Sequence, residues 1–335
     1  MKQILTMLLI CSVLVSCQKN NNSTTNVNTP LNGDILFERQ YPGFVAPWGV
    51  SYAPFDLFSL NTTTNSVTQL TNYSNNGVIN RSSRGASWNA DKSKFVFSCN
   101  KDDTAHAEIY SCLANGTFVT RLTNNAFVDY NPKFSPDGSK IAYSRNTGTP
   151  DDGSELMLMN ADGNNKVQLT NYTAVDGGNR VDGISWLNNN EIYFTSFKEA
   201  YATLIADIYK INLTTLVVTR LTNNLGIDDE MGLQLSPDGQ YFTFAKVYRT
   251  GTLFQTSEIY KLKVDGTGLT QLTAYSNSGS IDISSTQSSW TTDNKILFIS
   301  QKENSQGEIY EMNADGSNII RLTNNSMHEE FPTMR

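Results

Sequence analysis

The segment Asn131-Pro-Lys-Phe-Ser-Pro-Asp-Gly-Ser-Lys-Ile-Ala-Tyr-Ser144 opens one copy of a repeat that fills most of the chain. The copy continues through Glu155-Leu-Met-Leu-Met-Asn-Ala-Asp-Gly163 and ends on Val167-Gln-Leu-Thr170. A Leu-Thr pair closes every copy, with its leucine at Leu70, Leu122, Leu169, Leu221, Leu272 and Leu322. Six copies at spacings of 47 to 52 residues predict a solenoid or a propeller.

Each copy contains the turn and strand signals of a small antiparallel sheet. Lys140 to Tyr143 combines β-branched and aromatic residues, as strands do, and Ser135-Pro136-Asp137-Gly138 before it supplies turn residues. Asn160-Ala161-Asp162-Gly163 marks a second tight turn, between two further strands. Four short strands per copy, with no helical periodicity after the leader, are typical of propeller blades. We therefore expect an all-β fold, a six-bladed propeller with four antiparallel strands per blade.

The two ends of the repeat array predict how the ring closes. After the last Leu-Thr pair, Phe331 to Met334 matches only the first strand of a blade. The second, third and fourth strands of that blade are found at the other end, at Asp34 to Arg39, Phe55 to Leu60 and Ser66 to Thr71. We expect the C-terminal strand to join the N-terminal blade and to close the ring.

Two copies carry a motif with a known relative. The patterns Asp129-x-x-Pro132-x-Phe134-Ser135-Pro136-Asp137-Gly138 and Glu308-Ile309-Tyr310-x-Met312-Asn313-x-Asp315-Gly316 resemble the repeats of TolB-type β-propellers. The resemblance covers essentially the whole chain after the leader, and it implies the propeller fold. We expect no counterpart of the α/β domain that precedes the propeller in TolB.

The first 17 residues have the pattern of a bacterial export signal. A lysine is followed by an apolar run from Ile4 to Val15, which is too short to cross a bilayer. Ser16-Cys17 resembles the lipobox of bacterial lipoproteins, and this resemblance implies a lipid anchor, such as palmitate, at Cys17. Because Gln18 follows the cysteine, the same resemblance implies the outer membrane, facing the periplasm or the cell surface. An ordinary signal peptide with an incidental cysteine is the alternative.

The composition of residues 18–335 divides this part of the chain into two segments. Residues 18–33 are mostly Asn, Ser and Thr and predict a disordered tether, and residues 34–335 form the predicted propeller. The formal net charge of -7 argues against a nucleic-acid partner, which requires a basic surface. We expect a monomer that is held at the membrane only by its lipid.

Two cysteines remain outside the leader. Cys99 and Cys112 lie across one predicted hairpin, where an exported protein can keep a disulfide. Two separate, partly buried thiols are the alternative, because the sequence does not fix the strand register.

Charged residues precede the first strand of each blade, where they are expected to ring the mouth of the central channel. This candidate binding set comprises Arg84, Asp129, Arg180, Asp182, Asp228, Glu230, Asp282, His328 and Glu329. Three of its acids, Asp129, Glu230 and Glu329, occupy one repeat position and should converge. Such carboxylates either bind a hard cation such as Ca²⁺ or form ion pairs, for which Arg84 and Arg180 are the expected partners.

An insertion in the first blade is a second candidate surface. Tyr41, Phe44, Trp48 and Tyr52 lie in a stretch that departs most from the repeat. If these aromatic side chains are exposed, they form a patch that suits a protein or a sugar ring. If they fold back onto the propeller, they cap their own blade.

The sequence offers little for catalysis. It has two histidines, and no nucleophile elbow, zinc-protease or phosphate-loop motif is present. We therefore expect no catalytic residues and interpret the chain as a non-catalytic lipoprotein that binds an envelope protein or peptide through its loop face. The alternative is a glycan-binding module, or a glycan lyase or hydrolase that uses paired carboxylates at the channel mouth.

Overall fold

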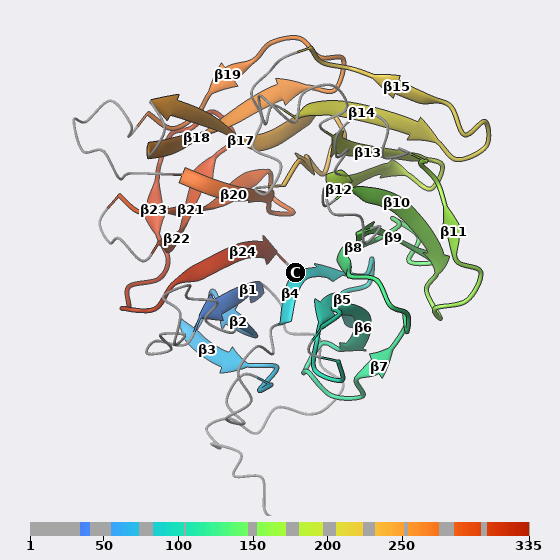
Figure 1. Cartoon of the computed structure of the whole chain (residues 1–335). Coiled ribbons are helices and arrows are strands. Elements are labelled where there is room, and N and C mark those ends of the chain that lie inside the picture. Colours follow the sequence, from blue (N-terminus) through green and yellow to red (C-terminus); the bar gives the residue numbers. More distant parts are fainter. Residues whose placement is uncertain are drawn as a thin grey trace, which may run out of the picture.

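The fold is a ring of six antiparallel sheets with four strands each (Figure 1). The computed structural model describes residues 34–40, 55–73, 83–103, 105–146, 153–171, 181–196, 206–223, 232–250, 254–274, 285–302 and 307–334. This arrangement confirms the six-bladed β-propeller that the repeats predict. Within these ranges no helix is long and apolar enough to cross a membrane.

The strands of each blade are given from the innermost to the outermost, an order that follows the chain except that the first blade begins with the last strand, β24. The first blade contains β24 (Glu329–Met334), β1 (Asp34–Gln40), β2 (Phe55–Asn61) and β3 (Ser66–Gln69). The second contains β4 (Ser83–Trp88), β5 (Lys94–Cys99), β6 (Glu108–Leu113) and β7 (Thr120–Arg121). The third contains β8 (Asp129–Phe134), β9 (Lys140–Asn146), β10 (Ser154–Asn160) and β11 (Val167–Gln168).

The remaining three blades repeat the same order. The fourth contains β12 (Val181–Asn188), β13 (Glu191–Ser196), β14 (Asp207–Asn212) and β15 (Val218–Arg220). The fifth contains β16 (Gln234–Leu235), β17 (Tyr241–Thr250), β18 (Phe254–Lys263) and β19 (Thr270–Gln271). The sixth contains β20 (Ser285–Trp290), β21 (Lys295–Ser300), β22 (Glu308–Asn313) and β23 (Ile320–Arg321).

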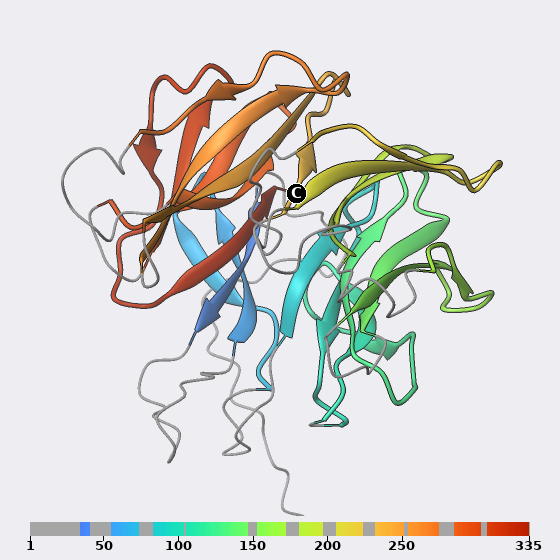
Figure 2. The same cartoon turned by 45° about the horizontal axis from the view of Figure 1, so that its top comes forward.

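The predicted ring closure is confirmed. The last strand, β24, pairs antiparallel with β1, and Met334 lies opposite Ile35 while Thr333 lies opposite Leu36. Figure 2 shows the red β24 beside the blue β1, so the two ends of the propeller share one blade. The hydrogen bonds of that sheet therefore join the first and last parts of the ring.

The core lies between neighbouring blades and is built on a repeated cross-strand pair. In five blades the pair is aromatic, for example Phe97 with Tyr110 at 5.8 Å between ring centroids and Phe298 with Tyr310 at 5.6 Å. In the third blade Tyr143 faces Met157 instead. Stacked rings at one level of each sheet fill the wedge between blades and exclude water from it.

The Leu-Thr signature has a structural role in every blade. Each threonine hydroxyl accepts a backbone N–H from its blade's third strand, as Thr170 does from Leu156 at 2.9 Å. The equivalent pairs are Thr71 with Leu57, Thr123 with Ile109, Thr222 with Ile208, Thr273 with Ile259 and Thr323 with Ile309. The threonine thus fixes the outermost strand to its neighbour.

The possible disulfide is not formed. The register of β5 and β6 places Cys99 opposite Glu108 and Cys112 opposite Phe95, so the two cysteines are four residues apart along the hairpin. That offset is roughly 13 Å, beyond the reach of a disulfide. Both thiols are free and buried, and burial raises the pKa of Cys99 to about 11.

Candidate functional site: the central channel and its seam

The innermost strands are shaped by a bulge that recurs around the ring. One residue with a positive φ lies in or just before each of these strands: Gly85, Asn131, Gly183, Gly232, Gln287 and Phe331. The pairing register shifts at the same place in β4, β8, β12, β20 and β24. A bulge of this kind redirects the side chains around it, which is why bulges are frequent at binding sites. Asn131, Gln287 and Phe331 also accept the steric cost of that conformation.

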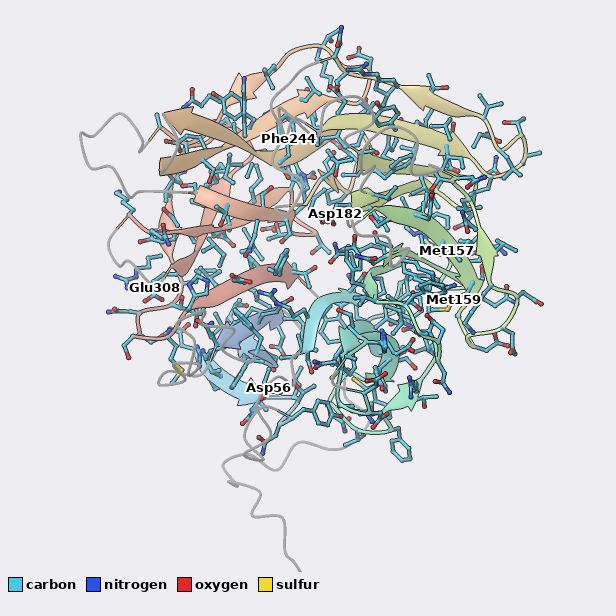
Figure 3. The ribbon with its side chains drawn as sticks, viewed as in Figure 1. Asp56, Met157, Met159, Asp182, Phe244 and Glu308 are labelled. Atoms are coloured by element: carbon cyan, nitrogen blue, oxygen red, sulfur yellow. The ribbon has the colours of Figure 1, made fainter. Side chains whose placement is uncertain are left out.

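Residues around these bulges line a cavity on the axis of the ring. All six innermost segments contribute, through Gly85, Ala86, Asn131, Lys133, Asp182, Gly183, Ile184, Gly232, Gln234, Gln287, Ser288, Ser289, Phe331, Pro332 and Thr333. The cavity volume is about 40 Å³, and part of the cavity is open to solvent. Figure 3 places Asp182 near the centre of the ring and Glu308 toward its periphery.

Lys133 is the basic side chain among the residues that line this cavity. It is half-buried, and desolvation by the surrounding walls lowers the pKa of its ammonium group to about 8. The negative charges of Asp182 and Glu38 act in the opposite direction. Asp182 accepts hydrogen bonds from the side chain of Asn131 and, at 2.9 Å, from the backbone N–H of Gly183.

A second polar cluster lies where the first and second blades meet. Glu38 on β1 is fully buried and accepts hydrogen bonds from the backbone N–H of Gly85 at 2.5 Å and from Nε of Arg84 at 3.3 Å. Arg84 also donates to Glu330 at 2.6 Å, and its guanidinium lies 4.3 Å from the centroid of Phe55. We call Glu38, Phe55, Arg84, His328 and Glu330 the seam cluster.

The pKa values of the two carboxyl groups in the seam cluster are shifted in opposite directions. Burial raises the pKa of Glu38 to about 7, although Arg84 opposes this change. The pKa of Glu330 is lowered despite the opposing effect of burial, because His328, 2.8 Å away, and Arg84 both stabilise its charged form. The side chain of Arg84 is 46% exposed, so the cluster fixes the position of a guanidinium group that solvent can reach.

Glu38 is unusual for its position in the repeat. On the innermost strand of each blade, the residue just before the bulge pairs with a residue of the second strand. That second-strand residue is Ser98 in the second blade, Ser144 in the third and Thr195 in the fourth. In the first blade this residue is Glu38, which lies opposite Glu330. A buried acid therefore replaces a small hydroxyl side chain at the seam of the ring.

Two of the predicted channel acids lie elsewhere. Asp129 and Glu329 are fully buried, and each is bound by an arginine of the neighbouring strand in its own blade. Nε of Arg145 is 2.7 Å from Asp129, and Arg39 contacts Glu329. The expectation that these carboxylates converge on the channel is corrected, because each is neutralised by an arginine on the second strand of its own blade.

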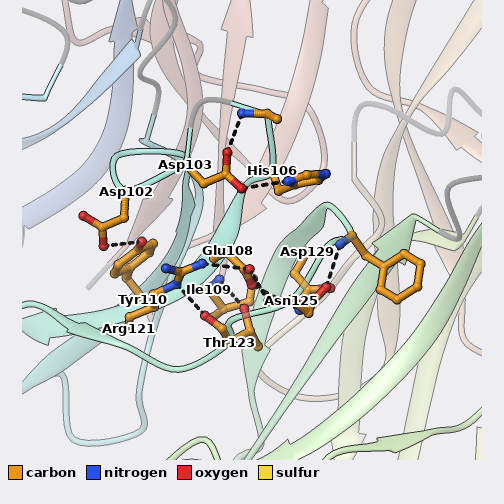
Figure 4. A network of polar contacts seen from close by, with 12 residues as sticks. Asp102, Asp103, His106, Glu108, Ile109, Tyr110, Arg121, Thr123, Asn125 and Asp129 are labelled. Atoms are coloured by element: carbon orange, nitrogen blue, oxygen red, sulfur yellow. Dashed lines mark hydrogen bonds and ion pairs between the residues drawn. The ribbon is translucent and has the colours of Figure 1, made fainter.

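Figure 4 shows the network that holds one of these acids. Asn125 donates its side-chain amide to Asp129 at 2.8 Å and its backbone N–H to Glu108 at 2.6 Å. Glu108 also accepts from Arg121 at 3.0 Å. Asn325, Glu308, Arg321 and Glu329 repeat this arrangement in the last blade. The network shapes the connection into the innermost strand, and it has a structural role.

The structure unites some of the predicted site residues and leaves others undetermined. Arg84 and His328 meet in the seam cluster, and Asp182 lines the cavity. Arg180, Asp228, Glu230, Asp282, Tyr41, Phe44, Trp48, Tyr52 and Cys17 lie outside the described residues. Among the described residues, no three His, Cys, Asp or Glu side chains are placed to hold a metal ion.

Sequence reasoning missed Glu38 and Lys133. A comparison of the copies position by position contains the signal for Glu38, since it is an acid where the second, third and fourth blades have serine or threonine. Lys133 follows the bulge residue Asn131 by two positions, but the bulge itself is not visible in the sequence.

Comparison with known proteins supports the repeat resemblance. No family model matches the chain. The Protein TolB homolog of Chlorobium luteolum is 28% identical over 180 residues, 53% of this chain and 36% of the relative. The Protein TolB homolog of Chlorobium chlorochromatii is 30% identical over 152 residues, 45% of this chain and 31% of the relative. The chain thus spans about a third of the length of these curated relatives.

Solved structures with a similar fold include proteins of different kinds. The crystal structure of TolB from Acinetobacter baumannii has a TM-score of 0.66 and 17% identity, and the match covers 91% of this chain and 67% of that one. An oligogalacturonate lyase in complex with manganese has a TM-score of 0.52 and 16% identity, covering 76% of this chain and 70% of that one. At these identities the likeness concerns the fold, which is the TolB-type propeller that the repeat motifs indicate.

Proposed function

We propose that the protein is a non-catalytic propeller of the bacterial cell envelope that binds a protein or peptide partner at its channel mouth. The observation that carries this proposal is the seam cluster. Arg84 is positioned by two carboxylates and by the ring of Phe55, yet almost half of its side chain faces solvent. Arginine and aromatic side chains that are held in place before binding are typical centres of protein interfaces.

The similarity to TolB homologues supports an envelope location. The proposal includes a lipid anchor at Cys17, the tether of residues 18–33 and the outer membrane as the site of attachment. In this account the anchor supplies the membrane attachment and residues 34–335 supply the binding surface.

The seam cluster favours binding over cleavage of a glycan. Glu38 and Glu330 have pKa values displaced in opposite directions, as the acid and base of a hydrolase do. However, Glu38 is fully buried and its two oxygens are bound by Gly85 and Arg84. A general acid must reach the leaving oxygen of its substrate, and Glu38 is enclosed too deeply for that role.

Replacement of Arg84 tests the binding role. We expect Arg84→Gln to weaken capture of the partner from envelope extracts at least about tenfold, since it removes a charged anchor from the interface. The captured protein is identified by mass spectrometry, and its affinity for purified wild type and variant is then measured by calorimetry. Lys166→Gln, an exposed lysine after the turn at the opposite end of its blade, is the control and should bind normally. Equal affinity of Arg84→Gln and wild type would remove the seam cluster from the interface.

Replacement of Cys17 tests the anchor. Cys17→Ala should yield a folded propeller that no longer sediments with membranes, because one lipid attachment carries the membrane binding. Fractionation of cells and the melting temperature of the released protein are the two measurements. A Cys17→Ala protein that still sediments with lipid would require a second membrane determinant.

A further inference from the structure

Two side-chain oxygens that line the central cavity accept hydrogen bonds from donors of the protein. Asp182 accepts from Gly183 and from the side chain of Asn131. The side-chain oxygen of Gln287 accepts the backbone N–H of Phe331 at 2.7 Å.

Three donors among the lining residues have no partner in the described part of the chain. The ammonium group of Lys133 forms no hydrogen bond or ion pair with any described residue. The hydroxyl groups of Ser288 and Ser289 are buried without a partner in the described part of the chain, and their residues are 4% and 5% exposed. Buried polar groups of this kind cost free energy unless a ligand or water satisfies them.

These donors lie at one level of the channel. Lys133 follows the bulge residue Asn131 by two positions, and Ser289 follows the bulge residue Gln287 by two positions. Their strands, β8 and β20, belong to the third and the sixth blade, which face each other across a ring of six. A ligand on the axis therefore has the strand that carries Lys133 on one side and the strand that carries Ser288 and Ser289 on the other.

We propose that the central cavity is a binding site for a single carboxylate group, which Lys133, Ser288 and Ser289 hold. One ammonium group and two hydroxyl donors match the two oxygens of a carboxylate. A doubly charged phosphate fits less well, because the cavity supplies one cation and Asp182 lies among its lining residues. The inference does not depend on the proposed partner-binding role.

A carboxylate has two plausible sources in this setting. It belongs either to a small organic acid or to the C-terminus of a peptide chain, which would place the end of a protein partner inside the propeller. Both sources share the chemistry of the site and differ in the contacts that they make beyond it.

Titration with model compounds tests the inference. The full chain, purified in detergent, is titrated with acetate and with its neutral analogue acetamide, and the backbone amide signals of Lys133, Gln234 and Ser289 are followed by NMR. We expect saturable shifts with acetate and none with acetamide. Lys133→Met should weaken acetate binding at least about tenfold, as loss of a charge-assisted hydrogen bond does. Lys140→Met, a half-buried lysine at the start of β9 that does not line the cavity, is the matched control.

The dependence on pH and the Ser289→Ala variant are further readouts. Because the pKa of Lys133 is about 8 while Asp182 and Glu38 hold it from falling further, acetate binding should weaken as the pH rises above 8. Ser289→Ala should weaken binding without changing this pH profile. These readouts keep the test decisive even where Lys133→Met changes the packing of the channel.

A tripeptide of alanines distinguishes the two sources. A chain terminus is supported if the free-acid peptide binds at least about tenfold tighter than acetate and its C-terminal amide does not bind. A small acid is supported if the peptide binds as tightly as acetate or more weakly. Failure of acetate and of the peptide to bind, or unchanged binding by Lys133→Met, would overturn the inference. The capture experiment with Arg84→Gln does not involve this site, so either proposal can fail alone.

Discussion

Individual residues explain which parts of the repeat are structural and which depart from it. The threonine of each Leu-Thr pair recurs in all six blades, and so does the acid just before the residue whose N–H the threonine accepts; both belong to the fold. Glu38, Arg84 and Lys133 occur in single blades. Residues that break a repeat at a solvent-reachable centre are the best candidates for function, because the fold does not require them.

Glu38 gives the stability of the protein a defined pH dependence. Its pKa rises from 4.5 in the unfolded chain to about 7 in the folded protein, so the folded state binds this proton more tightly. The stabilising contribution of Glu38 is therefore complete below about pH 4.5 and is lost as the pH rises through 7. Integrated over that pH range, this pKa shift changes the free energy of unfolding by at most on the order of 3 kcal/mol.

We expect Glu38→Gln to flatten the decline in the free energy of unfolding between pH 5 and pH 7. Denaturant unfolding at several pH values measures this slope. Glu330 titrates below this range and the lowered pKa of Lys133 lies above it, so neither accounts for the slope. A wild-type slope that Glu38→Gln leaves unchanged would show that another group carries it.

At the scale of the element, the Asp-Gly turns connect blades as well as strands. A Cβ on Gly163, which has a φ of +85°, would lie 2.9 Å from the carbonyl oxygen of Leu122 in the preceding blade. The equivalent glycines Gly116 and Gly316 approach the carbonyl oxygens of Leu70 and Leu272 in the same way. The turn of one blade therefore packs against the Leu-Thr pair of the blade before it.

This packing predicts different costs for two similar glycine replacements. Gly138→Ala should cost about 1 kcal/mol, since Gly138 has a φ of +70° but open space around it. Gly163→Ala should cost about 1 to 3 kcal/mol more, because the Leu122 backbone must move. Denaturant unfolding of both variants provides the comparison. Equal losses would mean that the turn conformation alone matters and that the contact between blades adds nothing.

The sequence predicts elements more reliably than the site. Turn residues such as Ser135 to Gly138 and the strand signals after them are local, so the blades and the ring closure follow from them. The position of the bulges is not local, because it depends on how each innermost strand fits the narrow axis of the ring. Asp129 and Glu329 were assigned to the channel for that reason, and the arginines that hold them, Arg145 and Arg39, lie on the neighbouring strands.

At the scale of the whole molecule, the seam combines the closure of the ring with its candidate interface. Glu330 belongs to the last strand, Glu38 to the first and Arg84 to the following blade, and one set of contacts joins all three. The two ends of a propeller blade face different surroundings. The described connections into the innermost strands, residues 122–128 and 323–328, lie at the end of the blades where the channel mouth is expected, whereas the Asp-Gly turns lie at the other end.

The central claim, that the channel mouth contacts a protein in the envelope, is tested most directly by photo-crosslinking in living cells. A benzophenone amino acid is placed at Phe127, which is 39% exposed beside the mouth, or at Leu216, which is 58% exposed at the opposite end of its blade. We expect a discrete crosslinked protein from position 127, weakened by Arg84→Gln, and none from position 216. Crosslinks from position 216 alone, or the same products from both positions, would contradict it.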